Sequence, residues 1–219
     1  MDILNFISWL KSGRYSATVP ANAVTVVGVP TNRRDDSYLP VTVPVSALAG
    51  SGGFTHYVGE LFGGGIIVEV WKDSLGVEHG LIASLINLGS VPWTIPAFQF
   101  GPAIGILAQD YQDGLGNTNA IIAQAGVLDT TYAAGRAKLF AGGGYNDWYL
   151  PSNLELNACY QSALIVNKVL GPTNGFATSY YWSSREVDSF TANQMIFLSG
   201  YLNQYDKNAI NIVRAVRTF

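Results

Sequence analysis

Few residues of this chain have side chains suited to catalysis. Its 219 residues include one cysteine and two histidines. A cysteine thiolate activated by a histidine is a strong nucleophile, and Cys159 with His56 or His79 is such a combination. Cys159, however, lies in a helical pattern beside Leu156 and Ala158, where a small apolar side chain fills space in a core. We therefore expect an unreactive Cys159 and no enzymatic activity.

Motifs for nucleotide and nucleophile chemistry are incomplete. GELFGGGIIVEV (59–70) places its glycines before the β-rich run, whereas a dinucleotide fingerprint places them after a strand. FAGGGYND (140–147) lacks the Lys and the Ser or Thr of a phosphate-binding loop. WSSRE (182–186) has two serines without the glycines of a nucleophile elbow. These absences predict that the protein needs no cofactor.

One stretch, DYQDGLGNTN (110–119), has oxygen ligands suited to calcium: Asp110, Asp113, Asn117 and Asn119. Their spacing does not match the EF-hand loop, and Asp-Gly and Gly-Asn pairs are common in turns. We expect no metal, and leave calcium at Asp110–Asn119 as the open alternative.

Two polar and aromatic stretches, 185–194 and 200–211, are predicted to be loops between apolar runs. Tyr and Asn offer flat apolar faces together with hydrogen bonds at small entropic cost, as in surfaces that bind sugars or proteins. The alternative is that these loops only keep a weakly charged domain in solution. The candidate ligand-binding residues are Arg185, Asp188, Phe190, Tyr201, Asn203, Tyr205 and Lys207.

Composition excludes some partners and favours others. The net charge is −3 and the Arg33–Arg34 pair is followed by Asp35 and Asp36, so the chain lacks the basic footprint of a nucleic-acid-binding protein. Charged residues make up 12%, about half the usual share of roughly 25%. This predicts a homo-oligomer that covers part of its surface, or alternatively a neutral surface rich in Asn, Ser, Thr, Tyr and Gly.

Membrane insertion is not expected. Residues 80–109 carry no Lys, Arg, Asp or Glu, but Pro92, Pro96 and Pro102 interrupt them, which is incompatible with a spanning helix. The apolar run near the N-terminus has no cationic segment before it and no small-residue cleavage site after it, so it does not match a signal peptide.

Residues 1–54 differ from the rest of the chain. A short amphipathic helix is predicted at Asp2–Lys11, followed by extended segments at 16–30 and 38–48 whose prolines favour sheet edges. The glycine-rich sequence at 48–54 ends this part. Because these segments have little means of forming a core, we expect residues 1–54 to be an anchor and oligomerisation segment.

Residues 55–219 are predicted to form one α+β domain. Pro151, Ser152 and Glu155 give a capping box for the strongest helix, and Gly171 with Pro172 ends it. Trp148, which precedes this helix, is expected to be a core aromatic beside local turn bonds of Asn146 and Asp147. The other predicted elements are a hairpin of 63–71 and 79–87, helices within 118–125 and 130–140, and strands within 179–184, 193–205 and 211–219.

Several of these stretches occur in the order found in one family. LFGGGIIVEVW with EHGLIAS, GLGNTNAIIAQ, YAAGRAKLF, GGYNDWYLPSNLELN, YYWSSRE and IVRAVRTF resemble the C-type-lectin-like domain at the C-terminus of bacterial collagen-like adhesins, which is related to the formylglycine-generating fold. The resemblance covers residues 57–219. It implies a twisted antiparallel sheet with flanking helices, in which the arginines tie the terminal strand to neighbouring loops. The implied scaffold residues are Trp148, Pro151, Trp182, Arg214 and Arg217.

The resemblance also bears on activity. It implies a trimer that recognises glycans through loops between the WSS strand and the terminal VR strand, here Arg185–Gln194 and Tyr201–Asn208. The active cysteines of formylglycine-generating enzymes have no counterpart, which argues against that activity. A sulfated glycan would need a basic face, and the loops offer only Arg185 and Lys207.

Residues 1–54 resemble the N-terminal segment of structural proteins from tailed bacteriophages, which precedes exposed fibre or decoration domains. Together the two resemblances predict a non-enzymatic virion protein, a head or tail fibre or a capsid decoration subunit, made in the host cytoplasm. Residues 1–54 would contact other virion proteins and mediate oligomerisation, and the domain would bind a host-surface glycan or protein. A homotrimer is the favoured oligomer. The alternative is a bacterial surface adhesin domain.

Overall fold

The computed structural model describes Ala23–Val27, Pro40–Pro44 and residues 53–219. The chain divides into two units, Met1–Gly53 and Phe54–Phe219. In the first unit, strand β1 (Ala23–Val27) pairs antiparallel with β2 (Pro40–Pro44). These strands lie within the extended segments predicted at 16–30 and 38–48. The predicted helix at Asp2–Lys11 lies outside the described residues.

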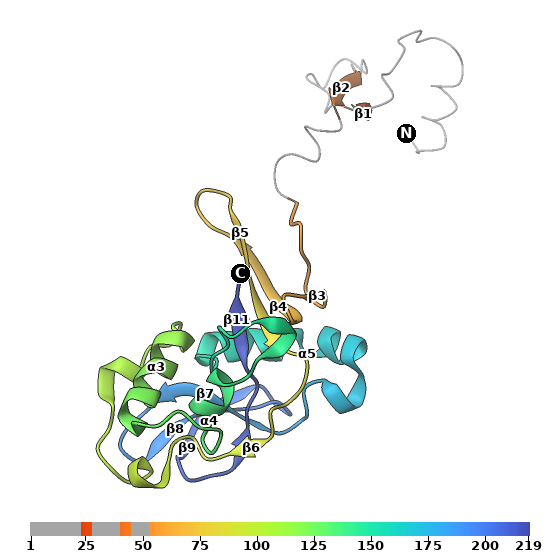
Figure 1. Cartoon of the computed structure of the whole chain (residues 1–219). Helices are drawn as coiled ribbons and strands as arrows, with labels where there is room; N and C mark the ends of the chain where they lie inside the picture. The colour runs from red at the N-terminus through yellow and green to blue at the C-terminus, as the bar shows by residue number, and fades with distance from the viewer. Residues whose placement is uncertain (1–22, 28–39, 45–52) are drawn as a thin grey trace. The chain divides into compact units, whose positions relative to one another are not determined.

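The second unit contains two sheets and three α-helices, which confirms the α+β class (Figure 1). One sheet has the order β6 (Ser90–Val91), β10 (Asn211–Ile212), β7 (Tyr180–Glu186), β8 (Thr191–Ile196) and β9 (Tyr201–Asp206). The other has the order β11 (Val216–Thr218), β5 (Glu78–Ser84), β4 (Gly65–Lys72) and β3 (Leu61–Phe62). The helices are α3 (Gly114–Ala125), α4 (Ala133–Lys138) and α5 (Asn153–Asn174), with short 3₁₀ turns η1 (Pro96–Phe98), η2 (Gly105–Ala108) and η3 (Gly142–Gly144).

The predicted hairpin is confirmed as β4 and β5, which pair antiparallel with a bulge between Ile67 and Glu69. Strand β11, near the C-terminus, pairs antiparallel with β5 on the other side. Gly80 is needed at this contact because a β-carbon there would collide with the ring of Phe219. The end of the chain is thus part of the sheet that begins the domain.

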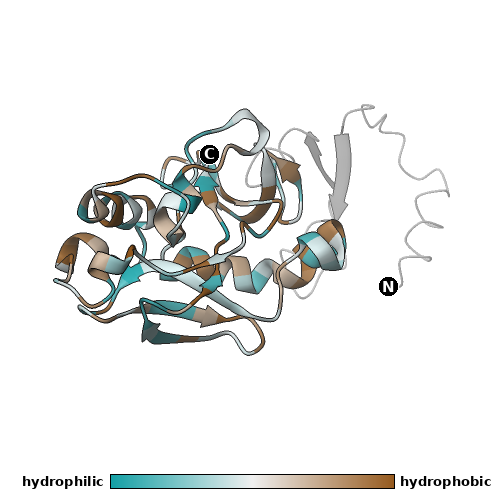
Figure 2. Ribbon diagram, turned by 60° about the horizontal axis from the view of Figure 1, so that its bottom comes forward, coloured by the Kyte–Doolittle hydropathy of each residue, from teal (hydrophilic) through white to brown (hydrophobic). Residues whose placement is uncertain are grey.

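Helix α5 begins as its sequence predicts. The Ser152 side chain accepts a hydrogen bond from the Glu155 amide, and the Glu155 carboxylate accepts one from the Ser152 amide. Gly171, with φ of 73°, breaks the regular helix at the predicted end, and one further turn follows to Asn174. In Figure 2 the helices carry both hydrophobic and hydrophilic bands, as expected for elements with one face on a core.

Two buried clusters fill the domain. Trp93, Trp148 and Trp182 are fully buried in one of them, with parts of α3 and α4. The indole N–H of Trp93 donates to the Ser183 carbonyl at 2.8 Å, and that of Trp182 donates to the Val91 carbonyl at 2.9 Å. The other cluster lies between α5 and both sheets. The two indole hydrogen bonds, of Trp93 and of Trp182, fix the loop after β6 against strand β7.

The boundaries predicted for the last strands are wrong, because each of two predicted runs is divided into two strands. The run 193–205 forms two strands, β8 and β9, separated by a turn. The run 211–219 also divides, because β10 pairs with β6 and β7 while β11 pairs with β5 in the other sheet. Most of the predicted loop residues at 185–194 and 200–211 consequently belong to strands.

The junction before α5 depends on an ion pair that is distant in sequence. Both carboxylate oxygens of Asp147 accept hydrogen bonds from Arg217, at 2.7 Å from Nε and 2.9 Å from Nη2. The guanidinium of Arg217 also lies 3.9 Å from the centre of the Tyr145 ring. The sequence prediction of local turn bonds for Asp147 therefore missed its main partner, which lies on the terminal strand.

The Asp147–Arg217 pair predicts a pH-dependent stability. Hydrogen bonding to Arg217 lowers the pKa of Asp147, so the stabilisation is present above the unfolded value of about 4 and is lost as pH falls through the folded value. Asp147→Asn should therefore lower the free energy of unfolding at neutral pH, and its difference from wild type should shrink near pH 3. Urea denaturation measures both. Asp206→Asn, an exposed site on β9, is the control, and a pH-independent difference for Asp147→Asn would contradict this role.

Candidate functional site

The seven candidate ligand-binding residues do not form one site. Asp188 and Phe190 lie at the tip of the β7–β8 hairpin, while Arg185 lies near the end of β7. The others belong to β9 or follow it. They differ in exposure and in the face of the sheet that they occupy.

Lys207 is a correction to the sequence prediction, because it is fully buried. Its Nζ lies 2.6 Å from Glu186 Oε1, whose side chain is also fully buried, and donates to the Ser189 carbonyl at 3.2 Å. The other oxygen of Glu186 accepts from the Gly105 amide at 2.7 Å. The ammonium also lies 5.1 Å from the centre of the Trp93 ring. Lys207 therefore joins three loops internally and offers no surface charge to a ligand.

Asp188 has a local structural role. Its Oδ1 accepts hydrogen bonds from the amides of Phe190 and Thr191, both at 2.8 Å, and from the Thr191 hydroxyl at 3.0 Å. These bonds shape the hairpin tip and present Phe190, which is 55% exposed. Phe190 remains available for an apolar contact at this tip.

Tyr201, Asn203 and Tyr205 alternate along the edge strand β9 and therefore share one face of the sheet. Both tyrosines are more than half exposed. The Asn203 side chain accepts a hydrogen bond from Gln194, which in turn accepts one from Asn211 at 2.6 Å. Arg185 bonds Asn193, which alternation places on the opposite face. The β9 residues thus form a surface distinct from that around Arg185.

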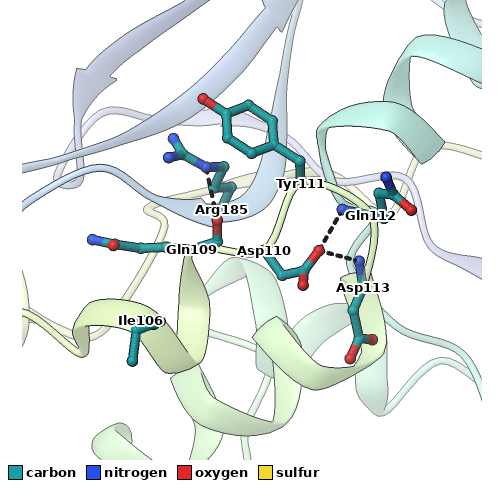
Figure 3. A pocket seen from close by; sticks show the side chains of 7 residues that line it. All are labelled: Ile106, Gln109, Asp110, Tyr111, Gln112, Asp113 and Arg185. Atoms are coloured by element: carbon teal, nitrogen blue, oxygen red, sulfur yellow. Dashed lines mark hydrogen bonds between the residues drawn. The ribbon is translucent and has the colours of Figure 1, made fainter.

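Arg185 forms one wall of an open hollow of about 810 Å³ (Figure 3). Its Nε donates to the Gln109 carbonyl at 3.0 Å, and its Nη1 donates to Asn193 Oδ1 at 2.9 Å. The guanidinium lies 4.0 Å from the centre of the Tyr111 ring. None of the ion pairs among the described residues includes Arg185. The hollow is lined by Ile106, Gln109, Asp110, Tyr111, Gln112, Asp113 and Arg185.

The turn that carries Tyr111 is held by its own acidic residues. Asp110 Oδ1 accepts from the amides of Gln112 and Asp113, at 2.7 and 3.0 Å, and these bonds lower the pKa of Asp110. Asp113 Oδ1 caps α3 by accepting from the Gly116 amide at 2.7 Å. The Asn117 side chain bonds both backbone groups of Asp110. Within the described part of the chain, no three His, Cys, Asp or Glu residues are grouped to hold a metal ion.

The Cys–His combination considered from the sequence is not assembled. Cys159 is fully buried on α5, and desolvation raises the pKa of its thiol to about 12. His56 Nδ1 lies 3.1 Å from Glu60 Oε2, and His79 Nε2 lies 3.4 Å from Asp73 Oδ2. Each histidine therefore has an acidic partner near its own hairpin, and the thiol stays protonated at neutral pH.

Sequence reasoning missed Tyr111, Gln109 and Gln112 as surface residues. They lie within or beside the stretch 110–119, for which only the possible oxygen ligands of calcium were predicted. An aromatic side chain between two glutamines in a turn was the available signal, since Tyr and amide side chains together favour a binding surface.

Comparison of the sequence with protein-family models and with curated proteins gave no match. Among the helices of the described residues, none has the length and apolar character required to cross a membrane.

The buried Glu186–Lys207 pair gives a stability prediction. Lys207→Met leaves a buried carboxylate without its cation, which costs about 3–5 kcal/mol in comparable cases. Glu186→Gln combined with Lys207→Met should recover part of that loss, because the double variant leaves no uncompensated charge. Chemical denaturation measures each free energy of unfolding. Lys168→Met, at an exposed position of α5, is the control, and an effect of Lys207→Met equal to that control would contradict the structural role.

Proposed function

We propose that the chain is a non-enzymatic structural protein of a tailed-phage virion, a head or tail fibre or a capsid decoration subunit. Its C-type-lectin-like domain, residues 55–219, binds a glycan on the host surface. The observation that carries the binding function is the hollow in which Arg185 stacks on Tyr111 without an acidic partner (Figure 3). A bacterial surface adhesin with the same domain is the alternative.

The topology supports a lectin-like domain. The chain enters through the β3–β4–β5 meander and leaves through β11, which returns to pair with β5. Between these strands it forms α3, α4, α5 and the second sheet. Arg217 joins the terminal strand to Asp147, and Arg214 donates to the Asn174 carbonyl at 2.9 Å. The arginines thus have the tying role that the family resemblance implies.

The chemistry of the hollow favours a sugar over a reacting substrate. An aromatic ring accepts the apolar face of a sugar, while amides, carboxylates and a guanidinium bond its hydroxyl groups. The hollow supplies Tyr111, Gln109, Gln112 and Arg185 for these contacts. Its acids bond backbone amides, as described above, and its only cation bonds neutral oxygens. Binding is therefore better supported than catalysis.

The virion assignment depends on the first 54 residues and on composition. Their resemblance to phage structural proteins, the weakly charged sequence and the division of the chain into two units support a subunit with one anchoring and one exposed part. A homotrimer fits the family resemblance. We place the anchor contacts with other virion proteins in residues 1–54 and the host contact in the domain.

A glycan array tests the binding site. Full-length protein should bind a subset of bacterial surface glycans, and Tyr111→Ala or Arg185→Gln should reduce that binding about tenfold or more, since each removes a direct contact worth more than about 1.4 kcal/mol. Tyr201→Ala with Tyr205→Ala is the matched control, because both side chains are more than half exposed and lie on β9. Loss of binding in that control, with retention in Tyr111→Ala, would move the site to the β9 surface.

Deletion of residues 1–54 tests the proposed anchor. The shortened chain should remain folded and bind glycan, because both hydrophobic clusters lie in residues 55–219, but it should be monomeric. Light scattering after gel filtration, compared with the full chain, measures the change. A shortened chain that keeps the full oligomeric state would contradict the assignment of oligomerisation to residues 1–54.

A further inference from the structure

A second hollow, of about 700 Å³, lies between helix α5 and strand β4. Glu69 and Trp71 of β4 line one side, and Leu154, Asn157 and Gln161 of α5 line the other. None of these residues belongs to the Arg185 hollow. The volume is within the range of about 300–1,000 Å³ typical of small-molecule sites.

The side chains of this second hollow suit a sugar as well. Trp71 is 38% exposed and its ring stacks on His79 with the centroids 5.8 Å apart, so the indole is held while part of it remains accessible. Asn157 and Gln161 supply amide groups, and Glu69 supplies a carboxylate. An aromatic side chain beside amides and carboxyl groups also lines the first hollow, which has Arg185 in addition.

The two hollows meet at Gln112, which lines both. Its carbonyl accepts a hydrogen bond from the Ser152 hydroxyl at 3.1 Å, and its amide donates to Asp110 at 2.7 Å. A backbone bond also joins the Leu154 amide to the Tyr111 carbonyl at 3.1 Å. The backbone of the turn is thus fastened to the start of α5, and this places Gln112 in the walls of both hollows.

We propose that the domain binds an extended oligosaccharide that occupies both hollows and crosses Gln112, with one sugar unit on Tyr111 and another on Trp71. This inference rests on the proposed glycan binding and adds to it the length of the ligand, which is an oligosaccharide and not a single terminal sugar. Two aromatic platforms on either side of a shared amide fit a polymer with repeated apolar faces. One linked chain gains affinity at the second platform without a second loss of translational freedom.

The charged side chains of the two hollows favour a neutral oligosaccharide. The walls carry the carboxyl groups of Glu69, Glu155, Asp110 and Asp113, whereas Arg185 is the only cation among the lining residues of the two hollows. A sulfated or uronic-acid polymer would bring repeated negative charges close to these acids, and like charges in a partly desolvated groove repel. Neutral sugars avoid this repulsion, and their hydroxyl groups can form hydrogen bonds with the carboxylates, amides and guanidinium of the two hollows.

The test uses full-length protein and neutral cello-, malto- and N-acetylchito-oligosaccharides of increasing length, with dissociation constants from calorimetry. For a bound series, affinity should rise about tenfold or more once a chain reaches both platforms. Trp71→Ala should remove that gain and leave binding of the shortest ligand unchanged, whereas Tyr111→Ala should weaken ligands of every length. Tyr57→Ala, an exposed aromatic that lines neither hollow, is the matched control.

The outcomes separate the two proposals. Affinity that does not depend on length, with Tyr111→Ala still weakening it, would overturn the extended site and keep the proposed function. Absence of binding to all three series would overturn the neutral-chain proposal, and the glycan array would decide the proposed function separately. A change of oligomeric state in Trp71→Ala, measured by light scattering, with binding to every length unchanged would assign the second hollow to a subunit contact and overturn the inference.

Discussion

The domain depends on the way that its last strands join two sheets. Strand β10 pairs with β6 and β7, and a few residues later β11 pairs with β5. Arg214, fully buried between them, donates to the Asn174 carbonyl and lies 4.6 Å from the centre of the Phe176 ring. Burial lowers the pKa of Arg214 to about 10, which still leaves it charged at neutral pH. The end of α5 is thereby fixed to the segment that both sheets share.

This constraint positions the two hollows in which we propose that a glycan binds. With the end of α5 held by Arg214 and its start held by the turn around Gln112, the helix lies along β4 at a set distance, and the second hollow forms between them. The same turn presents Tyr111 to Arg185 of β7. The two hollows are lined mainly by side chains from α5, β4, β7 and one short turn, and hydrogen bonds attach the turn to α5 and to β7. Such attachment lowers the entropy cost of binding a chain.

Sequence reasoning succeeded where the signal was local. The capping box of Ser152 and Glu155 and the stop at Gly171 are encoded within a few residues, and the structure has all of them. It failed where the partner is remote: Asp147 bonds Arg217, 70 residues away, and Lys207 is buried against Glu186. Polar composition alone cannot distinguish an exposed lysine from one inside a pair. Polar composition also does not show that the polar residues of a strand lie on two opposite faces of the sheet, as those of β8 and β9 do.

The sparse charge of the domain has a structural explanation that bears on its ligand. Arg214, Arg217 and Lys207 are buried or nearly so, and each is used to hold loops or strands together. Arg136 likewise donates to the carbonyls of Thr130 and Leu88. Because these cations bond groups of the framework, a partner of the surface would meet mainly aromatic, amide and hydroxyl groups. Such groups give weak electrostatic steering but good hydrogen-bonding complementarity, and the proposed neutral glycan is a partner that would use that combination.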